Sequence, residues 1–332
     1  MRILAGDVGG TKTLLAIYER ADDGAFTCTA RERFDSRHHE ALSPLVAGFI
    51  ETRGPIAAAA FGVAGPVQDG VCHTTNLPWI VDAAELSRSH GIADVSVLND
   101  FEATALGVDA LAGLPADLAT LLPLSSAVPL PDEPRAVFGA GTGLGAAILV
   151  PTPGPLPTVL RTEAGHADFA PRTDFERALD RTLRARYGRT SVERVLSGEG
   201  LGAIYATLLA QRGEAPTPSV AAELAAASDP AAAIGAAASH DAAAREAVER
   251  FVDAYGSEAG NFAVRCLPLG GMFIAGGIGP KHEGVMASGR FLERFLDKEP
   301  MREILARVPL ALVLEPDVAL LGARRAAVAS LG

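Results

Sequence analysis

The chain has 332 residues, enough for two domains with separate cores, and its 48% hydrophobic and 21% charged residues are ordinary for a soluble globular protein. Its net charge is −11 and it has no basic run, which argues against a nucleic-acid partner. Three cysteines without a Cys-x-x-Cys pair exclude a disulfide framework and give no sign of structural zinc. No apolar run reaches membrane-spanning length and the first residues lack a signal-peptide pattern, so we expect no membrane association and a cytoplasmic location.

The first third of the chain alternates predicted strands and helices. Apolar runs predict strands at residues 2–5, 13–18, 25–34, 56–63 and 95–98. Helical spacing of apolar residues predicts helices at residues 42–52, 83–90 and 101–111. This alternation is typical of an α/β domain.

A second domain follows a segment rich in proline, residues 114–134, which we interpret as a connection. Beyond it the sequence predicts a strand, glycine loop and strand over 135–150, mostly helix over 173–265, strands at 271–275 and 308–314, and a closing helix at 318–330. We expect a small α/β domain of residues 1–112 plus 316–332 and a large α/β domain of residues 113–315.

The turn from Asp7 to Lys12 joins the first two predicted strands and contains Gly9, Gly10 and Thr11. Adjacent glycines allow a sharp backbone turn whose N–H groups can approach an anion such as phosphate. Gly-Gly is also a common tip of a plain β-hairpin, so the turn by itself leaves both interpretations open.

The opening of the chain is echoed near its middle. Residues 3–17 and residues 136–150 each read as an apolar strand, a loop of small residues with Gly and Thr, and a second apolar strand. Each segment opens one half of the chain, which favours two related α/β domains facing each other.

The second glycine loop also matches a dinucleotide-binding pattern. Gly141-Thr142-Gly143-Leu144-Gly145-Ala146 satisfies G-x-G-x-x-G/A, and Glu163 follows about 20 residues later. That pattern requires a helix directly after the glycines, whereas residues 146–150 read as a strand that runs into four prolines. The dehydrogenase interpretation is therefore weak, and no Walker P-loop pattern occurs in the chain.

Two hairpin glycine loops, one in each domain, make better sense as a clamp on the phosphates of ATP. Residues 7–11, 139–143 and 273–278 resemble the phosphate-1, phosphate-2 and adenosine segments of the actin-like ATPase superfamily. With Leu98-Asn-Asp-Phe101, residues 163–171 and residues 193–198, the chain resembles the bacterial glucokinase family over nearly its whole length. The resemblance implies a two-domain actin-like ATPase fold, ribonuclease H-like, with an interdomain cleft that closes on the sugar, and it suggests a homodimer.

The same resemblance implies a nucleotide site. Its residues would be Gly6, Asp7, Val8, Gly9, Gly10, Thr11, Gly141, Thr142, Gly143, Gly276 and Gly277. Asp7 would hold Mg²⁺ through water, since Mg²⁺ keeps much of its hydration and needs few carboxylates. Lys12 departs from the closest bacterial glucokinases, which commonly have Asn there, and we leave it out of the catalytic set.

The sugar site and the catalytic base are implied by three segments. Asp100 would be the base that takes the proton of the sugar 6-hydroxyl, and Asn99 would bind a sugar hydroxyl. Glu163, His166 and Glu193 would hold the other hydroxyls.

Without the resemblance these residues have ordinary alternatives. Residue 99 or 100 would cap the following helix, Glu193 would lie in the first turn of a helix, and Glu163, His166 and Asp168 would bind a metal. We interpret Asp168 as a local capping or turn group, and Asn76 as a residue that helps to shape the sugar pocket.

The function that follows is ATP-dependent phosphorylation of D-glucose at the 6-hydroxyl, with glucose and ATP as partners. A kinase for mannose, fructose or an amino sugar remains open, as does polyphosphate as the donor. A sugar-responsive repressor on the same fold would need a DNA-binding extension before Ile3 and a basic patch, and we expect neither. The zinc-containing branch of the wider sugar-kinase and repressor group would need a cysteine cluster. An actin-like nucleotide switch would not need the set of Glu163, His166 and Glu193.

Overall fold

The computed structural model describes residues 1–114 and 119–331, so part of the expected connecting segment lies outside the described residues. The chain divides into two compact units. The first comprises Met1–Thr120, Leu149–Leu160 and Glu315–Gly332, and the second comprises Leu121–Ile148 and Arg161–Leu314. The expected boundaries put residues 149–160 in the second domain. In the structure this segment belongs to the first unit, because Leu156 and Val159 pack against a core that Ile3 and Leu106 help to form.

The first unit is built on a five-stranded sheet with the order β3-β2-β1-β4-β8. Its strands are β1 (Arg2–Val8), β2 (Lys12–Arg20), β3 (Phe26–Asp35), β4 (Ala58–Val63) and β8 (Asp94–Asn99). The neighbours β1, β2 and β3 are antiparallel, whereas β4 runs parallel to both β1 and β8. The predicted hairpin at the start of the chain is confirmed, and it forms the middle of the sheet.

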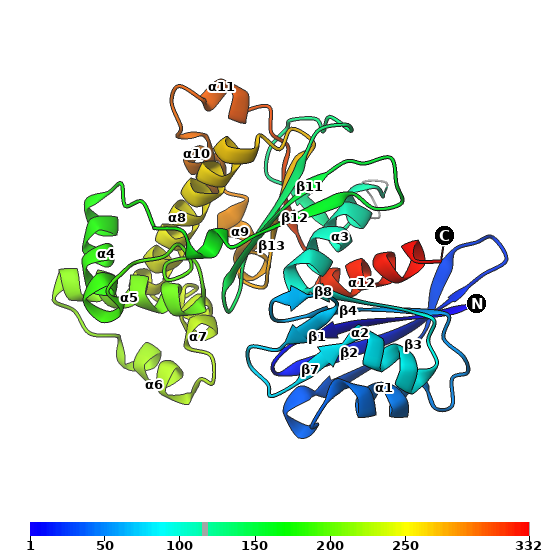
Figure 1. Ribbon diagram of the computed structural model, residues 1–332. Coiled ribbons are helices and arrows are strands. Elements are labelled where there is room, and N and C mark those ends of the chain that lie inside the picture. Colours follow the sequence, from blue (N-terminus) through cyan, green and yellow to red (C-terminus); the bar gives the residue numbers. More distant parts are fainter. Residues whose placement is uncertain (115–118, 332) are drawn as a thin grey trace. The chain divides into compact units, whose positions relative to one another are not determined.

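Helices cover both faces of this sheet (Figure 1). They are α1 (Leu42–Ile50), α2 (Ala83–His90), α3 (Asp100–Ala112) and α12 (Val318–Ala329). Leu4 and Val8 of β1 pack in one core with α1 and α2, while Ile3 and Ala5 pack in another core with α3 and α12. Side chains of a strand alternate between its faces, and both faces here are buried, which explains why β1 reads as an uninterrupted apolar run.

A small three-stranded sheet is formed by the part of the chain between β4 and α2, where the sequence predicts no strands. It consists of β5 (Val67–Gln68), β6 (Val71–His73) and β7 (Ile80–Asp82). Strands of two or three residues are too short to show an alternating pattern. The sheet is anchored by Trp79, which is 2% exposed and donates a hydrogen bond from Nε1 to the carbonyl oxygen of His39 at 3.1 Å.

The other large sheet has six strands in the order β12-β11-β10-β13-β14-β9, and most of its residues belong to the second unit. Its strands are β9 (Leu121–Pro123), β10 (Arg135–Ala140), β11 (Leu144–Val150), β12 (Thr158–Thr162), β13 (Gly271–Ala275) and β14 (Leu310–Val313). β9 comes from the expected connecting segment and pairs antiparallel with β14. Its proline is tolerated because β9 is an edge strand. β11 continues directly from the glycine loop, so no helix follows that loop and the dinucleotide interpretation is excluded.

The helices of the second unit account for most of its core. They are α4 (Asp174–Tyr187), α5 (Gly198–Arg212), α6 (Pro218–Ala226), α7 (Pro230–Ala237), α8 (Ala242–Cys266), α9 (Glu283–Met286), α10 (Arg290–Leu296) and α11 (Arg302–Leu305). The long helix α8 packs against α5, α7 and α10 (Figure 1). Its side chains join those of β10 and β13 in one core. The alanine-rich stretch near residues 220–238 forms α6 and α7, as its composition predicts.

The two sheets repeat one arrangement. When the strands of each large sheet are counted along the chain, leaving out β9, both sheets have the order third, second, first, fourth, fifth. In each unit the fourth strand runs parallel to the first and the fifth parallel to the fourth. The internal repeat predicted from residues 3–17 and 136–150 is therefore a repeat of topology, and the expected α/β class is confirmed.

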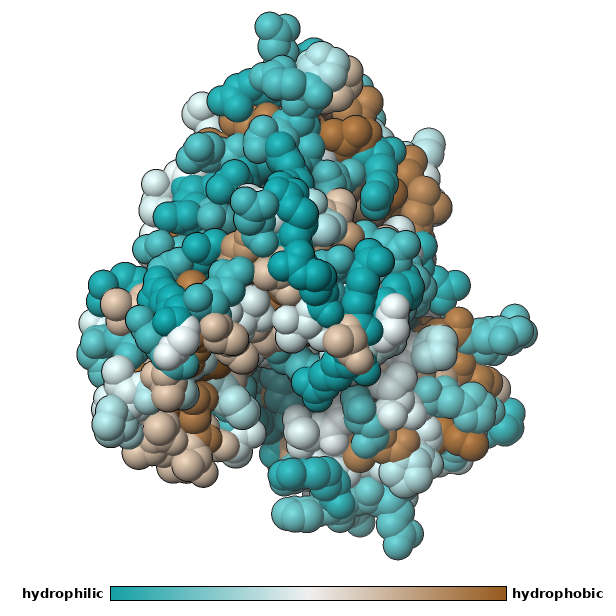
Figure 2. Space-filling view, turned by 90° about the vertical axis from the view of Figure 1, so that its left-hand side faces the viewer, coloured by the Kyte–Doolittle hydropathy of each residue, from teal (hydrophilic) through white to brown (hydrophobic). Residues whose placement is uncertain are grey.

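Hydrophilic side chains cover most of the face drawn in Figure 2, and apolar side chains occur there in small groups. Within residues 1–114 and 119–331, no helix combines the length and the apolar character that crossing a membrane requires.

Candidate active site

The first glycine turn is held firmly within its own unit. The backbone N–H of Gly9 donates to the carbonyl oxygen of Lys12 at 2.9 Å, which leaves Gly10 and Thr11 at the tip. Ser36, fully buried, donates from its hydroxyl to the carbonyl oxygen of Gly9 at 2.8 Å, and its backbone N–H donates to Thr11 at 3.1 Å. A rigid turn of this kind keeps its backbone dipoles oriented before a ligand arrives, which lowers the free-energy cost of binding.

Two residues of the expected nucleotide set, Gly6 and Val8, lie in β1 and are buried. A Cβ on Gly6 would lie 2.4 Å from the ring of Phe61, so packing alone accounts for glycine at this position. At the tip of the turn, a Cβ on Gly10 would lie 2.6 Å from Cβ of Asn76. Asn76 therefore packs against the turn itself.

Asp7 is the polar residue at the end of β1, and burial raises its pKa to about 6. The ammonium group of Lys12 opposes this rise, whereas the carboxylates of Asp100 and Asp317 add to it. A bound cation would stabilise the charged form of such a carboxyl group, which has other carboxylates nearby and limited access to solvent.

Asn99 and Asp100 lie where β8 ends and α3 begins. The side-chain oxygen of Asn99 accepts from the N–H groups of Phe101 at 3.0 Å and Glu102 at 3.4 Å, and its amide donates to the carbonyl oxygen of Gly65 at 2.9 Å. The capping role that the sequence allowed is thus present, and Asn99 fills it. Asp100 is the first residue of α3, and its Oδ1 accepts from the N–H of Phe101 at 2.8 Å.

In the second unit, the loop at residues 141–143 is bound by the side chain of Glu193. Oε2 of Glu193 accepts from the N–H of Leu144 at 2.9 Å, and a Cβ on Gly143 would lie 2.5 Å from that oxygen. The N–H of Glu193 donates to the carbonyl oxygen of Gly165 at 2.9 Å. Glu193 precedes α5 and lies in no helix, so the alternative of a first-turn helix residue is excluded. It joins the glycine loop to the segment that holds Glu163 and His166.

Gly276 and Gly277 follow β13 and are exposed. Gly276 has a φ of +85°, and a Cβ there would lie 2.3 Å from the carbonyl oxygen of Ala140, so both its conformation and its contacts require glycine. The Cβ position of Gly141 is 4.0 Å from the backbone nitrogen of Gly277. The two glycine segments of this unit are therefore neighbours, as a shared nucleotide would require.

Glu163 directly precedes the short 3₁₀ helix Ala164–His166 and His166 is its last residue; their side chains are 86% and 60% exposed. Oε2 of Glu163 lies 3.9 Å from Nε2 of His166. Asp168 instead forms an ion pair with Arg189 at 2.8 Å, in line with a local structural role. In the described part of the chain no three His, Cys, Asp or Glu side chains come together as metal ligands, so nothing supports the alternative metal site.

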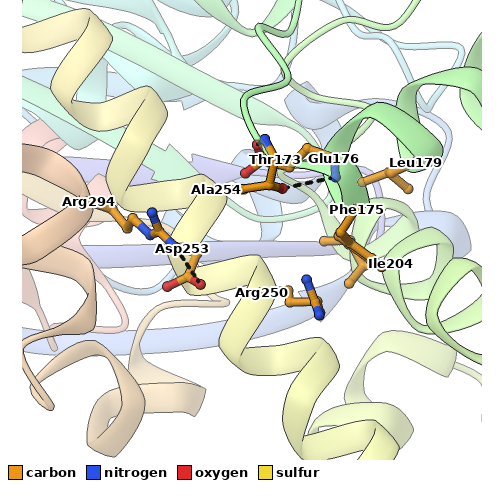
Figure 3. Close-up of a pocket in the computed structure, with 9 residues that line it drawn as sticks. All are labelled: Thr173, Phe175, Glu176, Leu179, Ile204, Arg250, Asp253, Ala254 and Arg294. Carbon is orange, nitrogen blue, oxygen red and sulfur yellow. Dashed lines mark hydrogen bonds and ion pairs between the residues drawn. The ribbon is translucent and has the colours of Figure 1, made fainter. Parts of the chain in front are cut away.

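The second unit has a pocket between α4, α5, α8 and α10 (Figure 3). None of the candidate site residues lines it. Its polar groups are already paired with one another. Asp253 faces Arg294 at 3.6 Å, the N–H of Glu176 donates to Thr173 at 3.1 Å, and the guanidinium of Arg250 lies over the ring of Phe175 at 4.1 Å.

Sequence reasoning missed two residues that support the glycine loops, Ser36 and Tyr255. Ser36 braces the first turn, and the Tyr255 hydroxyl lies under the second, 2.9 Å from the backbone nitrogen of Ala140. Neither belongs to a local motif. Tyr255 lies within a helical stretch where an aromatic residue is ordinary core, so only tertiary contacts reveal its role.

Two units with the same strand order, each with a hairpin glycine loop, define a protein of the two-domain actin-like ATPase fold. A sequence model named glucokinase matches residues 4–330. A glucokinase from Nostoc punctiforme is 38% identical over 337 residues, covering 97% of each chain. The chain belongs to the glucokinase family.

Solved structures agree with this assignment. The crystal structure of a glucokinase from an Antarctic psychrotroph has a TM-score of 0.83 and 30% identity, with 98% of each chain covered. A ROK-family glucokinase from Streptomyces griseus, solved with glucose and AMPPNP, shares the fold at a TM-score of 0.63, with 18% identity and 100% of each chain covered.

Proposed function

We propose that this protein transfers the γ-phosphoryl group of ATP to the 6-hydroxyl of D-glucose. The observation that carries the proposal is the placement of Asp100 at the first turn of α3, close enough to Asp7 to raise its pKa, in the unit that also holds the first glycine turn. Family membership supports glucose as the acceptor, and the relative from Streptomyces griseus was solved with glucose and an ATP analogue.

Asp100 is the general base in this proposal. The attacking 6-hydroxyl must lose its proton as its oxygen bonds to the γ-phosphorus, and a carboxylate within hydrogen-bond reach accepts that proton and orients the oxygen. Asn99 holds the start of α3 through its capping bonds, so its part in catalysis includes fixing where Asp100 lies. We retain it as a candidate sugar ligand as well.

The second unit supplies the remaining sugar ligands, Glu163, His166 and Glu193. Glu163 and His166 are exposed, and together with Glu193 they offer the carboxylate and imidazole groups that sugar hydroxyls bind. Glu193 has one carboxylate oxygen engaged by Leu144, which orients the side chain before the sugar binds. Catalysis then rests on positioning and on electrostatic stabilisation, with no covalent intermediate on the protein.

The nucleotide contacts would come from Gly9–Thr11 with Asp7 in the first unit, and from Gly141–Gly143 with Gly276 and Gly277 in the second. The donor set fits Mg²⁺, because Asp7 is a half-buried carboxylate with other carboxylates nearby, and oxygen is the ligand that Mg²⁺ prefers. Asp7 would hold the ion through water. When bound, the ion supplies positive charge that offsets the charge of the transferring phosphoryl group.

The cellular setting of the proposal follows from the family. We propose a cytoplasmic homodimer that supplies glucose 6-phosphate to glycolysis. Size-exclusion chromatography with light scattering measures the oligomeric state, and a monomeric mass at micromolar concentration would remove the dimer from the proposal.

A coupled assay with ATP and Mg²⁺ over a panel of hexoses tests the function. We expect the highest kcat/KM for glucose, lower values for mannose, fructose and glucosamine, and no product from 6-deoxyglucose, which lacks the accepting hydroxyl. Parallel reactions with polyphosphate in place of ATP identify the donor. Absence of turnover with every hexose would overturn the kinase proposal, and a preference for another hexose would change the substrate alone.

A further inference from the structure

Tyr255 is a fully buried residue of α8 that lies beneath both glycine segments of the second unit. Its ring is held by three aromatic neighbours, with centroid distances of 5.9 Å to Phe138, 5.8 Å to Phe251 and 5.6 Å to Phe291. These contacts fix the ring, so its hydroxyl has one position relative to the sheet.

That hydroxyl lies where two parallel strands end. β10 and β13 pair from Arg135 with Gly271 as far as Gly139 with Ala275, and the two glycine segments begin directly afterwards. The Tyr255 oxygen accepts from the N–H of Ala140 at 2.9 Å. Its own proton faces the carbonyl oxygens of Ala275 at 3.3 Å and Phe138 at 3.4 Å. One hydroxyl thus contacts the last residues of both strands.

Ala140 is also bound from its other side. Its carbonyl oxygen accepts from the N–H of Ile278 at 3.3 Å, and it lies 2.3 Å from where a Cβ on Gly276 would be. The Ala140 peptide is therefore a junction between residues 139–143 and residues 276–278. From the core, Tyr255 supplies a side-chain hydrogen bond to this junction.

We infer that Tyr255 is a positioning residue that sets the spacing of the two nucleotide-binding segments through its hydrogen bonds to Ala140 and Ala275. The inference rests on the proposed assignment of residues 141–143 and 276–277 to the nucleotide. Removing the hydroxyl leaves a buried N–H and a buried carbonyl without their partner, and such groups move toward water or another partner. The segments would then be less well arranged for ATP.

Tyr255→Phe tests the inference, because phenylalanine keeps the ring and its packing. We expect the KM for ATP and the dissociation constant for ADP, measured by calorimetry, to rise roughly three- to tenfold, the scale of one lost hydrogen bond. The KM for glucose should rise by less than the KM for ATP, since Tyr255 bonds to Ala140 itself, whereas Glu193 is joined to the loop further along, through the N–H of Leu144.

Tyr205→Phe is the matched control. Tyr205 is 4% exposed on α5, and its hydroxyl has no hydrogen-bond partner among residues 1–114 and 119–331. Removing that hydroxyl should leave both KM values and the ADP affinity unchanged. If Tyr255→Phe behaves like Tyr205→Phe, or weakens glucose and nucleotide equally, Tyr255 has no specific positioning role.

Gly277→Val distinguishes a failure of the inference about Tyr255 from a failure of the proposed nucleotide site. A Cβ on Gly277 would meet no atom of the described residues within 4 Å apart from its chain neighbours, so the loop itself has room for a side chain there. Unchanged ADP binding in Gly277→Val would overturn the assignment of this segment to the nucleotide. Weakened ADP binding in Gly277→Val together with normal binding in Tyr255→Phe would overturn the role of Tyr255 alone.

Discussion

Asn99 and Asp100 are adjacent in the chain; the capping role belongs to Asn99, and Asp100 is the proposed catalytic base. Asn99 satisfies the first N–H groups of α3 and holds the carbonyl oxygen of Gly65, whereas Asp100 follows it as the first helical residue. The cap determines the direction in which the chain enters α3, and thereby the place of the Asp100 carboxylate. A structural and a catalytic interpretation of the pair are therefore complementary.

Replacing Asp100 by Asn should lower kcat by roughly 10²-fold or more, the scale of general base catalysis, because the amide cannot accept the proton. The KM for glucose should change comparatively little, since the amide keeps the size and a hydrogen-bonding oxygen. Steady-state kinetics with glucose and ATP measure both quantities. A near-normal kcat would remove Asp100 from the mechanism.

Glu102→Gln is the control for that substitution. Glu102 is the other acidic residue in the first turn of α3, so its change removes the same charge from the same helix terminus. Loss of either charge should weaken the favourable interaction with the helix dipole by about 0.3–1 kcal/mol. We expect kcat to fall only in Asp100→Asn, which separates proton transfer from helix stability.

At the scale of elements, α3 packs on the sheet through a glycine. A Cβ on Gly62 of β4 would lie 2.7 Å from Cβ of Ala103 and 3.9 Å from Cα of Asp100. β4 also pairs with β1 so that Gly62 lies opposite Asp7. The missing side chain at residue 62 thus lets the first turn of α3 approach the end of β1, and it brings the two carboxylates into the same region of the first unit.

Gly62→Ala should push the first turn of α3 away from the sheet and lower kcat roughly tenfold or more, since displacement of about 1 Å at a reacting group is costly. Ala103→Gly in the same chain removes the Cβ atom that the new side chain at residue 62 would contact. The double variant should regain most of the lost kcat, although glycine within a helix lowers stability by about 1 kcal/mol. Equal kcat values in the single and double variants would show that this contact does not position Asp100.

Elements with long regular patterns were predicted well, and short ones were not. The strand at Gly271–Ala275 and the helix at Ala83–His90 have the expected bounds, because each is bounded by clear polar or glycine signals. β9 and β12 were missed. β9 has three residues among prolines and exists because β14 offers it an edge, which no local pattern can indicate.

At the scale of the whole molecule, the stability of the second unit depends on the protonation of a buried carboxyl group. Glu258 of α8 is 5% exposed, and burial raises its pKa above the ordinary 4.5, although Asn261, the backbone of Ala170 and Lys298 oppose the rise. Because the folded-state pKa is the higher one, the native state binds this proton more tightly. The stabilisation from this proton is therefore complete below the unfolded-state pKa, and it is lost as the pH rises from there through the folded-state pKa.

Glu258→Gln removes this titration, so its free energy of unfolding should improve relative to the parent chain as the pH rises from about 4 to 8. Urea unfolding at a series of pH values measures the difference. Glu246→Gln on the same helix is the opposite case. Burial raises the pKa of Glu246, but Arg250 and Arg212 lower it by more, so its pKa lies below the ordinary value. Glu246→Gln should therefore lose stability relative to the parent chain as the pH rises. A pH-independent difference for Glu258→Gln would contradict the expectation.

The sequence by itself determined the class of fold, the internal repeat and the family, because these depend on local periodicity and on motifs that are contiguous in the chain. It also pointed to the hairpin of residues 9–11 and to Asp100. Only the tertiary structure decided how these segments are supported. Ser36 beneath the first turn, Glu193 on Leu144 and Tyr255 under Ala140 act across 27, 49 and 115 positions of sequence. Such partners are selected by packing, which a linear pattern does not record.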